Sequence, residues 1–360
     1  MNNIHLLFLL FLMFCNRTAN SQEVSFSLSK SGKFIDSEKK YVANQTSKDH
    51  IQEMEALGIE GSTIYYNLMD KTNTKDPLWW VQKYYLSQNI PTNIVLILKK
   101  KGSSSLELIN TGYFDHELDR FSKKLVEYGT KVTLTILHES NGGWYPWGAC
   151  YRNNNYKALV KSYTRINNIL IHNNARHYVD LTANFNRRGC DAVFEDWSEY
   201  LPYIESIVDS YSISTYNRCG SSEDYKKEVS FETDFNPAYQ ALSAVTQKPI
   251  NIGEIATSGL CGNSLNWYKN LLKSLSKYPQ VKNVNFFFGD ISKGFASNDI
   301  SLSWGFEDKS EIRNFKKLLL SFSESKLNNE LPFSTKIKLP WDLQVFNTLP
   351  FSSPDRKSVV

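Results

Sequence analysis

The sequence lacks several features that would assign it to common classes of protein. It contains no G-x-G-x-x-G or Walker motif, which disfavours a doubly wound sheet that binds nucleotides. It also contains no C-x-x-C and no closely spaced Cys/His pair, so we expect neither a metal site nor a cofactor. The formal net charge of +4 over 360 residues is too small to indicate nucleic acid as a partner.

Long apolar runs are scarce as well. Leu6–Phe14 is an unbroken apolar run of 9 residues, shorter than the roughly 20 residues that span a bilayer. The small residues Ala19 and Ser21 then stand at positions suited to cleavage by a signal peptidase. We therefore predict a signal peptide over residues 1–21 and a secreted or periplasmic protein without a membrane span.

Cysteine is rare, with 5 residues in the chain, and Cys15 falls in the predicted signal peptide. A lipid anchor at Cys15 is the less favoured alternative, because Phe14 precedes it where a lipoprotein site requires a small residue. The remaining cysteines are even in number, which in an exported chain indicates two disulfides. They are Cys150, Cys190, Cys219 and Cys261.

Short β-rich runs recur along the chain, and several are nearly continuous in Val, Ile, Leu and Phe. Amphipathic segments such as 114–129 and 156–171 lie between them. Eight strands alternating with about eight helices predict an α/β protein, a single-domain (β/α)8 TIM barrel. The predicted strands are residues 23–29, 62–68, 93–99, 131–137, 178–184, 209–217, 249–255 and 284–290.

The boundaries of the barrel follow from the ends of this pattern. We place the catalytic domain at residues 22–330, with no internal repeat or long linker. Residues 331–360 carry four prolines and no clear periodicity, which predicts an extended C-terminal tail. Its first half is expected to pack through Trp341 and Phe346. We expect a monomer whose partner is a polysaccharide or oligosaccharide substrate.

Candidate catalytic residues collect at the C-terminal ends of the strands, where active sites of this fold lie. Strand 131–137 leads to His138 and Glu139, and strand 249–255 carries Glu254 near its end. The fourth and seventh strands face each other across a small barrel, so two carboxyls would flank one cleft. Glycoside hydrolysis needs such a pair, one to protonate the leaving oxygen and one to attack the anomeric carbon, at roughly 5–5.5 Å for retention.

Aromatic residues make up 14% of the sequence, and two tryptophans follow Glu139 closely. The rings of Trp144 and Trp147 are predicted to stack on the apolar faces of sugars, with simple packing of the loop as the alternative. An aromatic pocket would also raise the pKa of Glu139, as an acid catalyst requires.

Polar residues at the ends of two further strands complete the candidate site. Tyr216 lies one strand away from Glu254, and its hydroxyl is predicted to bind that carboxylate and keep it ionised. Asn184 ends the fifth strand, and a role in binding sugar and a role in the structure are about equally favoured. His138 either contacts sugar or braces the site.

At these residues the sequence resembles glycoside hydrolase family 26, the β-mannanase family within the clan of retaining (β/α)8 glycosidases. "HESNGGWYPWG" (138–148) is similar to the acid/base motif of the family. "KPINIGEIATSG" (248–259) resembles its nucleophile strand, and "VDSYSISTYN" (208–217) the strand with the tyrosine that contacts the nucleophile. "SLSWGF" (301–306) resembles a late loop with a tryptophan platform. The resemblance covers about residues 50–320.

The resemblance implies that Glu139 is the general acid/base and Glu254 the nucleophile. It implies β-mannan as the favoured substrate, with β-1,3/1,4-glucan second. The segment after the third strand, "LKKKGSSSLELINTGYF", has no counterpart of the sugar-contacting histidine or aromatic residue that the family often places there. The residues assigned to substrate binding are His138, Asn141, Trp144, Trp147, Asn184, Tyr216 and Trp304.

Two other functions fit the same residues. One is a non-catalytic carbohydrate-binding protein on a glycosidase scaffold, which would not need a second carboxyl at the reacting centre. The other is a transglycosylase, in which a sugar hydroxyl replaces water.

The four remaining cysteines follow the fourth, fifth, sixth and seventh predicted strands, one in each loop of the active-site face. Neighbouring loops are the easiest to bridge within the roughly 4.4–6.8 Å between Cα atoms that a disulfide permits. We therefore favour Cys150–Cys190 with Cys219–Cys261. The alternatives are Cys190–Cys219 with Cys150–Cys261, or four unpaired thiols.

Overall fold

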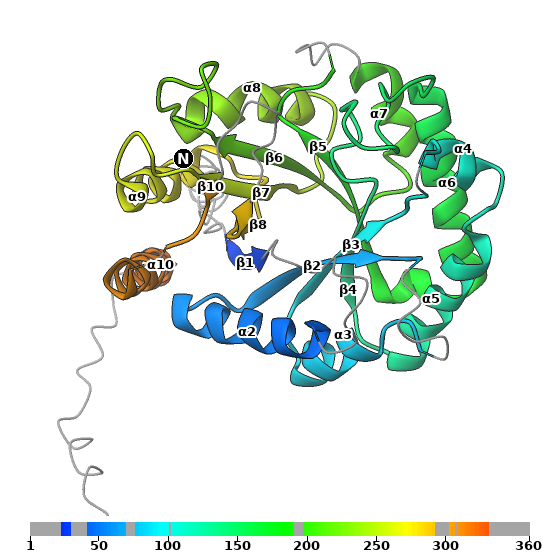
Figure 1. Cartoon of the computed structure of the whole chain (residues 1–360), viewed down its shortest axis with the longest axis horizontal. Coiled ribbons are helices and arrows are strands. Elements are labelled where there is room, and N and C mark those ends of the chain that lie inside the picture. Colours follow the sequence, from blue (N-terminus) through cyan, green and yellow to red (C-terminus); the bar gives the residue numbers. More distant parts are fainter. Residues whose placement is uncertain are drawn as a thin grey trace, which may run out of the picture. The chain divides into compact units, whose positions relative to one another are not determined.

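The computed structural model describes residues 23–29, 42–69, 76–100, 102–190, 197–291, 302–306 and 308–330. Residues 22–323 form one compact unit. Its centre is a closed barrel of eight parallel strands in chain order, in which β8 also pairs with β1. Helices surround the barrel (Figure 1). The predicted (β/α)8 TIM barrel is confirmed, whereas the predicted signal peptide and C-terminal tail lie outside the described residues.

The strands of the barrel agree with the predicted ones to within two residues at nearly every end. They are β1 (Ser25–Ser29), β2 (Gly61–Asn67), β3 (Thr92–Ile97), β4 (Val132–Ile136), β5 (Val179–Asn186), β6 (Ser210–Asn217), β7 (Ile250–Thr257) and β8 (Asn283–Phe287). A short antiparallel pair follows, β9 (Asp290–Ile291) and β10 (Leu302–Ser303).

The helices are mostly short, and several are followed or preceded by a turn of 3-10 helix. They are α2 (Val42–Leu57), α3 (Trp79–Tyr84), α4 (Ser105–Asn110), α5 (Asp115–Tyr128), α6 (Tyr156–His172), α7 (Trp197–Ile204), α8 (Phe231–Ser243), α9 (Ser264–Ser274) and α10 (Lys309–Glu330). None of the helices that the structure describes is long and apolar enough to cross a bilayer.

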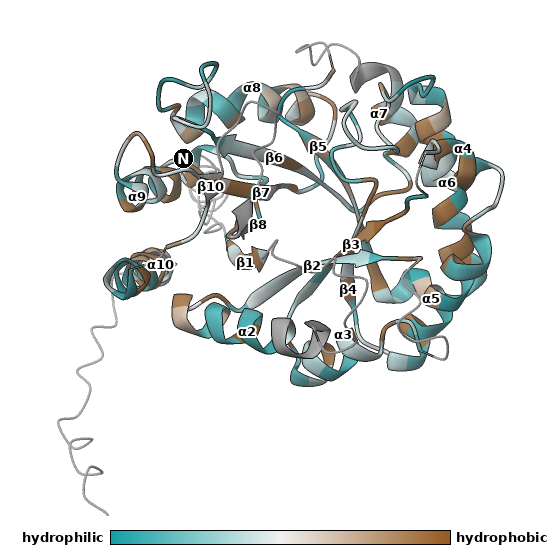
Figure 2. Ribbon diagram, viewed as in Figure 1, coloured by the Kyte–Doolittle hydropathy of each residue, from teal (hydrophilic) through white to brown (hydrophobic). Residues whose placement is uncertain are grey.

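Helix α5 shows how the sequence encodes the outer ring. Leu118, Phe121 and Leu125 recur at helical spacing and are buried, because they lie on the face that packs against the barrel. The helix ends at Gly129, whose φ of 65° is left-handed and suits a residue without a side chain. In Figure 2 the surrounding helices alternate between hydrophobic and hydrophilic residues, as expected of helices with one buried face.

The strands alternate in polarity, whereas the sequence suggested strands that are apolar on both faces. Most of their apolar side chains turn outward to the helices: Tyr66 of β2, for example, packs on Phe121 of α5. Tyr65, Tyr216 and Phe287 instead belong to a small cluster separate from the main core. The opposite face carries Ser, Thr and Asn side chains that bond to each other between neighbouring strands. Thr135 Oγ1 donates to Asn93 Oδ1 at 2.9 Å, and the hydroxyls of Thr182 and Ser210 lie 2.8 Å apart. Much of the barrel interior is thus a hydrogen-bonded polar layer.

Both disulfides that the positions favoured are present. Cys150–Cys190 joins the loops after β4 and β5, with 6.1 Å between the Cα atoms. Cys219–Cys261 joins the loops after β6 and β7, with 5.8 Å between the Cα atoms. These bonds are compatible with an extracellular protein, since disulfides persist in oxidising compartments.

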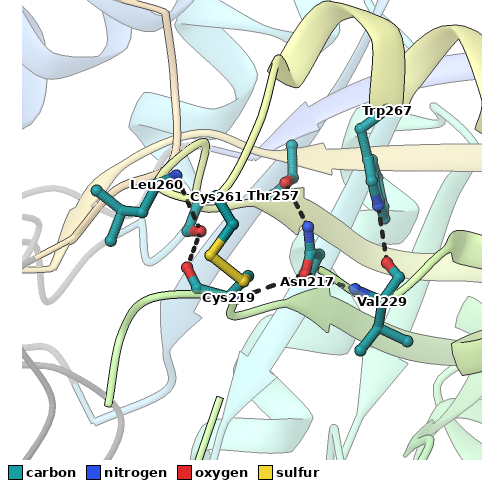
Figure 3. Close-up of a disulfide and its surroundings, with 8 residues drawn as sticks. Asn217, Cys219, Val229, Thr257, Leu260, Cys261 and Trp267 are labelled. Atoms are coloured by element: carbon teal, nitrogen blue, oxygen red, sulfur yellow. Dashed lines mark hydrogen bonds between the residues drawn. A yellow bond between two sulfur atoms is a disulfide. The ribbon is translucent and has the colours of Figure 1, made fainter. Parts of the chain in front are cut away.

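The Cys219–Cys261 bond is surrounded by hydrogen bonds within and between the same two loops (Figure 3). Asn217 donates to Thr257 Oγ1 at 2.9 Å, and its Oδ1 accepts the backbone N–H of Val229 at 3.2 Å. The hydroxyl of Ser258 donates to the carbonyl of Cys219. The bond therefore secures an interface that also has its own polar contacts.

Removing Cys219–Cys261 is expected to lower the melting temperature. The bond spans 42 residues, for which the chain-entropy model gives about 4 kcal/mol, or a loss of roughly 10 °C. The measurement is thermal unfolding of the Cys219→Ser/Cys261→Ser variant, with Cys150→Ser/Cys190→Ser as its counterpart. Free thiols in the oxidised wild-type protein, detected by alkylation and peptide mapping, would contradict the pairing.

Candidate active site

The backbone around Glu139 leaves the regular strand geometry. Immediately after β4, Leu137 and Glu139 have φ of 52° and 51°, the left-handed region that non-glycine residues seldom adopt. The peptide groups released from the ladder find partners on β5. The N–H of Glu139 donates to Asn184 Oδ1 at 2.8 Å, and the N–H of Ser140 donates to the Asn184 carbonyl at 3.2 Å. These bonds stabilise a conformation that would otherwise be strained.

The carboxyl of Glu139 is buried, with 6% of the residue exposed. Trp144 Nε1 donates to Oε2 and Asn186 Nδ2 donates to Oε1, both at 2.7 Å. Burial raises the pKa of Glu139, and these two hydrogen bonds oppose the rise because they favour the ionised form. The predicted direction of the pKa shift is confirmed, and Asn186 is a partner that the sequence analysis did not identify.

Trp144 and Trp147, which were predicted to act alike, lie in different environments. Trp144 is 49% exposed, so its ring face is open while its edge holds Glu139. Trp147 is 2% exposed, and its Nε1 donates to the His138 carbonyl at 2.7 Å. Its ring stacks on Tyr145 at 4.8 Å between centroids. The prediction of a sugar platform at Trp147 is therefore corrected to a support beneath the site.

His138 is enclosed by aromatic rings. Its ring lies 4.4 Å from that of Tyr145 and 5.8 Å from that of Tyr65, measured between centroids. Burial lowers the pKa of His138 to about 3, so the imidazole is neutral at neutral pH. A neutral ring that packs in this way braces the site, which was one of the two roles that the sequence allowed.

A β-bulge places Glu254. Ile213 of β6 pairs with Ile252, but the next residue, Ser214, pairs with Glu254, so Gly253 is extra. In a regular strand Glu254 would face the same side as Ile252, toward the helices. The bulge shifts the alternation by one residue and turns Glu254 into the barrel.

Two tyrosine hydroxyls hold the carboxyl of Glu254. Tyr216 OH donates to Oε2, as predicted, and Tyr65 OH donates to Oε1. Burial and then the nearby charge of Glu139 raise the pKa of Glu254 to about 8, and the two hydroxyls only partly offset this rise. The hydrogen bond from Tyr216 favours the ionised form of Glu254, in the predicted direction, while burial and the charge of Glu139 oppose it. Tyr65, from β2, was not identified from the sequence.

The two carboxyls are both buried, and the charge of Glu139 influences the protonation of Glu254. In such a pair the first group to ionise disfavours ionisation of the second, so a singly protonated state persists over a wide pH range. A state with one acid and one carboxylate is what a two-carboxyl mechanism requires. Within the part of the chain that the structure describes, no group of three or more His, Cys, Asp or Glu side chains is arranged to hold a metal ion.

Three other predicted sugar contacts are buried. Asn141 is fully buried and exchanges two 2.8 Å hydrogen bonds with the backbone of Asn186. Asn184 is 3% exposed. Trp304 is 1% exposed, with its ring 5.5 Å from that of Tyr216. None of the three offers an open surface in this structure, and their contacts are with residues that surround Glu139 and Glu254.

Replacing Glu254 by Gln is expected to stabilise the fold at neutral pH. Because the pKa of Glu254 is raised from 4.5 to about 8, its contribution to stability is complete below pH 4.5 and is lost as pH rises through 8. A neutral amide does not incur this loss. The melting temperature of the variant should match wild type near pH 4 and exceed it by roughly 3–8 °C at pH 8. The control is Glu228→Gln at an exposed position; a Glu254→Gln effect that is independent of pH would contradict the assignment.

The fold and site define a (β/α)8 protein with two buried carboxyls at the C-terminal ends of β4 and β7. No family model matches the chain. Among curated proteins it is similar to Endoglucanase H of Acetivibrio thermocellus, with 29% identity over 247 residues, which are 67% of this chain. The chain spans about a quarter of that relative's length, since the match covers 26% of it.

Solved structures with the same fold include mannanases. A GH26 β-mannanase from Bacteroides ovatus has a TM-score of 0.56 at 13% identity, covering 85% of this chain and 89% of its own. The catalytic domain of a GH26 endo-β-1,4-mannanase from Bacillus sp. JAMB-750 has a TM-score of 0.59 at 14% identity, with coverages of 84% and 86%. These likenesses are of fold: the chain is similar to these GH26 structures in its (β/α)8 barrel.

Proposed function

We propose that the chain is a retaining β-glycosidase in which Glu254 is the nucleophile and Glu139 the general acid/base. The observation that carries the proposal is the pair of buried carboxyls from β4 and β7. Each accepts hydrogen bonds from two neutral donors, and they are close enough for Glu139 to raise the pKa of Glu254. A non-catalytic carbohydrate-binding protein would not require two such groups at one barrel mouth, whereas a transglycosylase would share them.

In the first step the Glu254 carboxylate attacks the anomeric carbon while Glu139 transfers its proton to the leaving oxygen. The hydroxyls of Tyr65 and Tyr216 hold the carboxylate in place before attack. Once Glu254 is an ester it carries no charge, which lowers the pKa of Glu139 and suits it to act as a base. Glu139 then takes a proton from water, the water oxygen bonds to the anomeric carbon, and Glu254 leaves as a carboxylate.

We propose β-glucan as the first substrate and β-mannan as the second. The curated relative Endoglucanase H shares 29% identity with the chain, whereas the two mannanase structures described above share 13% and 14%. The acid/base motif supports β-mannan through its likeness to the mannanase family. Glucose and mannose differ in configuration at C2, and hydrogen bonds to the 2-hydroxyl strengthen in the transition state. The rates of hydrolysis of β-glucan and β-mannan should therefore differ.

We further propose that the protein is secreted and acts within polysaccharide chains. The N-terminal apolar run and the two disulfides support export. The exposed ring of Trp144 beside Glu139 supports a sugar subsite next to the reacting bond.

The test is hydrolysis of lichenan, barley β-glucan, β-1,3-glucan, mannan and glucomannan by the wild-type protein, with sizing of the products. Proton NMR of the first products gives the anomeric configuration, and we expect retention. A preparation of Glu254→Ala controls for contaminating activity. An inverted product would contradict double displacement, and binding without cleavage would favour the non-catalytic alternative.

A further inference from the structure

One amide inside the barrel contacts the backbones that carry both glutamates. Asn184 of β5 is 3% exposed, and its Oδ1 accepts the N–H of Glu139 at 2.8 Å. Its Nδ2 donates to Ser212 Oγ at 2.8 Å. Both bonds lead away from its own strand, one toward β4 and one toward β6. The Asn184 side chain is therefore shared between neighbouring strands of the polar interior.

The same amide packs against the bulge before Glu254. A Cβ atom at Gly253 would lie 2.3 Å from Asn184 Nδ2 and 2.9 Å from Ser212 Oγ. No side chain fits at that distance, so the amide and the glycine backbone are in direct contact. On its other side the Gly253 carbonyl accepts Asn285 Nδ2 at 2.6 Å. The bulge is thus held between two buried asparagines, from β5 and β8.

We propose that Asn184 is a positioning residue that couples the placement of the two catalytic carboxyls. Its oxygen fixes the left-handed peptide of Glu139, and its nitrogen packs on the glycine that turns Glu254 inward. The inference rests on the proposed glycosidase function and goes beyond it, because Asn184 is buried and contacts the backbone of Glu139 and Gly253 and not the two carboxyls. It acts through the two glutamates.

The chemistry of asparagine suits this position. The oxygen accepts from one strand and the NH₂ donates to the next, so one neutral side chain serves both. An aspartate would have no donor for Ser212 and would add a third negative charge near Glu139 and Glu254. An alanine would leave the N–H of Glu139 without its acceptor, and the φ of 51° at Glu139 would lose its support.

The first experiment measures how rate depends on the leaving group. Aryl glycosides with leaving groups of increasing pKa are compared for wild type, Asn184→Ala and Thr182→Ala. Thr182 is the matched control, because it is a buried polar residue of the same strand whose hydroxyl bonds only to Ser210 among the contacts described. If Asn184 positions Glu139, the rate of Asn184→Ala should fall roughly 100-fold on substrates with poor leaving groups and less than about tenfold on substrates with very good ones. Thr182→Ala should change the rates on all substrates by one common factor.

The second experiment does not depend on activity. Gly253→Ala should strongly lower the melting temperature in the wild-type background, because its new methyl group meets the Asn184 amide. In the Asn184→Ala background the Asn184 amide is absent, so Gly253→Ala should lower the melting temperature clearly less than in the wild-type background. Hydrogen exchange at the Glu139 amide should accelerate in Asn184→Ala and stay slow in Thr182→Ala.

The results distinguish the role of Asn184 from the proposed glycosidase function. Parallel leaving-group plots for Asn184→Ala and Thr182→Ala in an active enzyme would overturn the role of Asn184 alone. Additive melting temperatures for Gly253→Ala and Asn184→Ala would overturn it as well. A wild-type protein that cleaves no glycoside would instead contradict the proposed function.

Discussion

Glu254→Ala is expected to lower the turnover of polysaccharide by on the order of 10⁵-fold while the barrel remains folded. Without the carboxylate no covalent intermediate forms. Neither Tyr65 nor Tyr216 can replace it as a nucleophile, because burial, the largest cause of their raised pKa values, persists in the variant and keeps both hydroxyls protonated. The measurement is the initial rate on the best substrate of the panel, with thermal unfolding to confirm the fold.

Glu254→Gln should lose as much activity as Glu254→Ala and yet be more stable than wild type near pH 8. Glu228→Ala, at an exposed position in the loop after β6, is the control and should keep near-normal activity. If Glu254→Ala hydrolysed polysaccharide at a rate close to wild type, the assignment of the nucleophile would be wrong.

Glu139→Ala is expected to affect substrates according to their leaving groups. Polysaccharide and poor leaving groups need protonation as the bond breaks, so their rates should fall by roughly 10²–10⁴-fold. Activated aryl glycosides do not need it and should still form the intermediate, which then accumulates because no base activates water.

Azide provides a sharp check on this second prediction. As an anionic nucleophile it needs no base, so it should restore turnover of activated substrates by Glu139→Ala and release a glycosyl azide of retained configuration. Wild type should gain little from azide. Equal losses on good and poor leaving groups, with no response to azide, would remove Glu139 from the acid/base role.

The sequence predicted the barrel well because its signals are local and repeated. Each strand is a short β-rich run, and each outer helix has one apolar face. The positions of the cysteines, one per loop, were enough to favour the pairing that the structure shows. Such features depend on chain order and spacing, which a sequence displays directly.

The details of the site depend on contacts between distant segments, and the sequence did not reveal them. Tyr65 looks like an ordinary aromatic residue of β2, yet its hydroxyl reaches Glu254, which is 189 positions away. Asn186 lies two residues beyond the Asn184 that was singled out. Trp144 and Trp147 stand in one motif, and no periodic pattern tells which ring is open. The bulge at Gly253 interrupts the alternation on which strand predictions rest.

The polar layer inside the barrel has a consequence for how stability varies with temperature. On unfolding, newly hydrated apolar surface raises the heat capacity by roughly 0.45 cal/K/mol per Å², whereas polar surface lowers it by about 0.26. A barrel filled with Ser, Thr and Asn side chains therefore has a smaller heat-capacity change than one filled with Val, Ile and Leu. Its free energy of unfolding follows a flatter curve with temperature, and it should lose less stability in the cold than an aliphatic barrel of equal length.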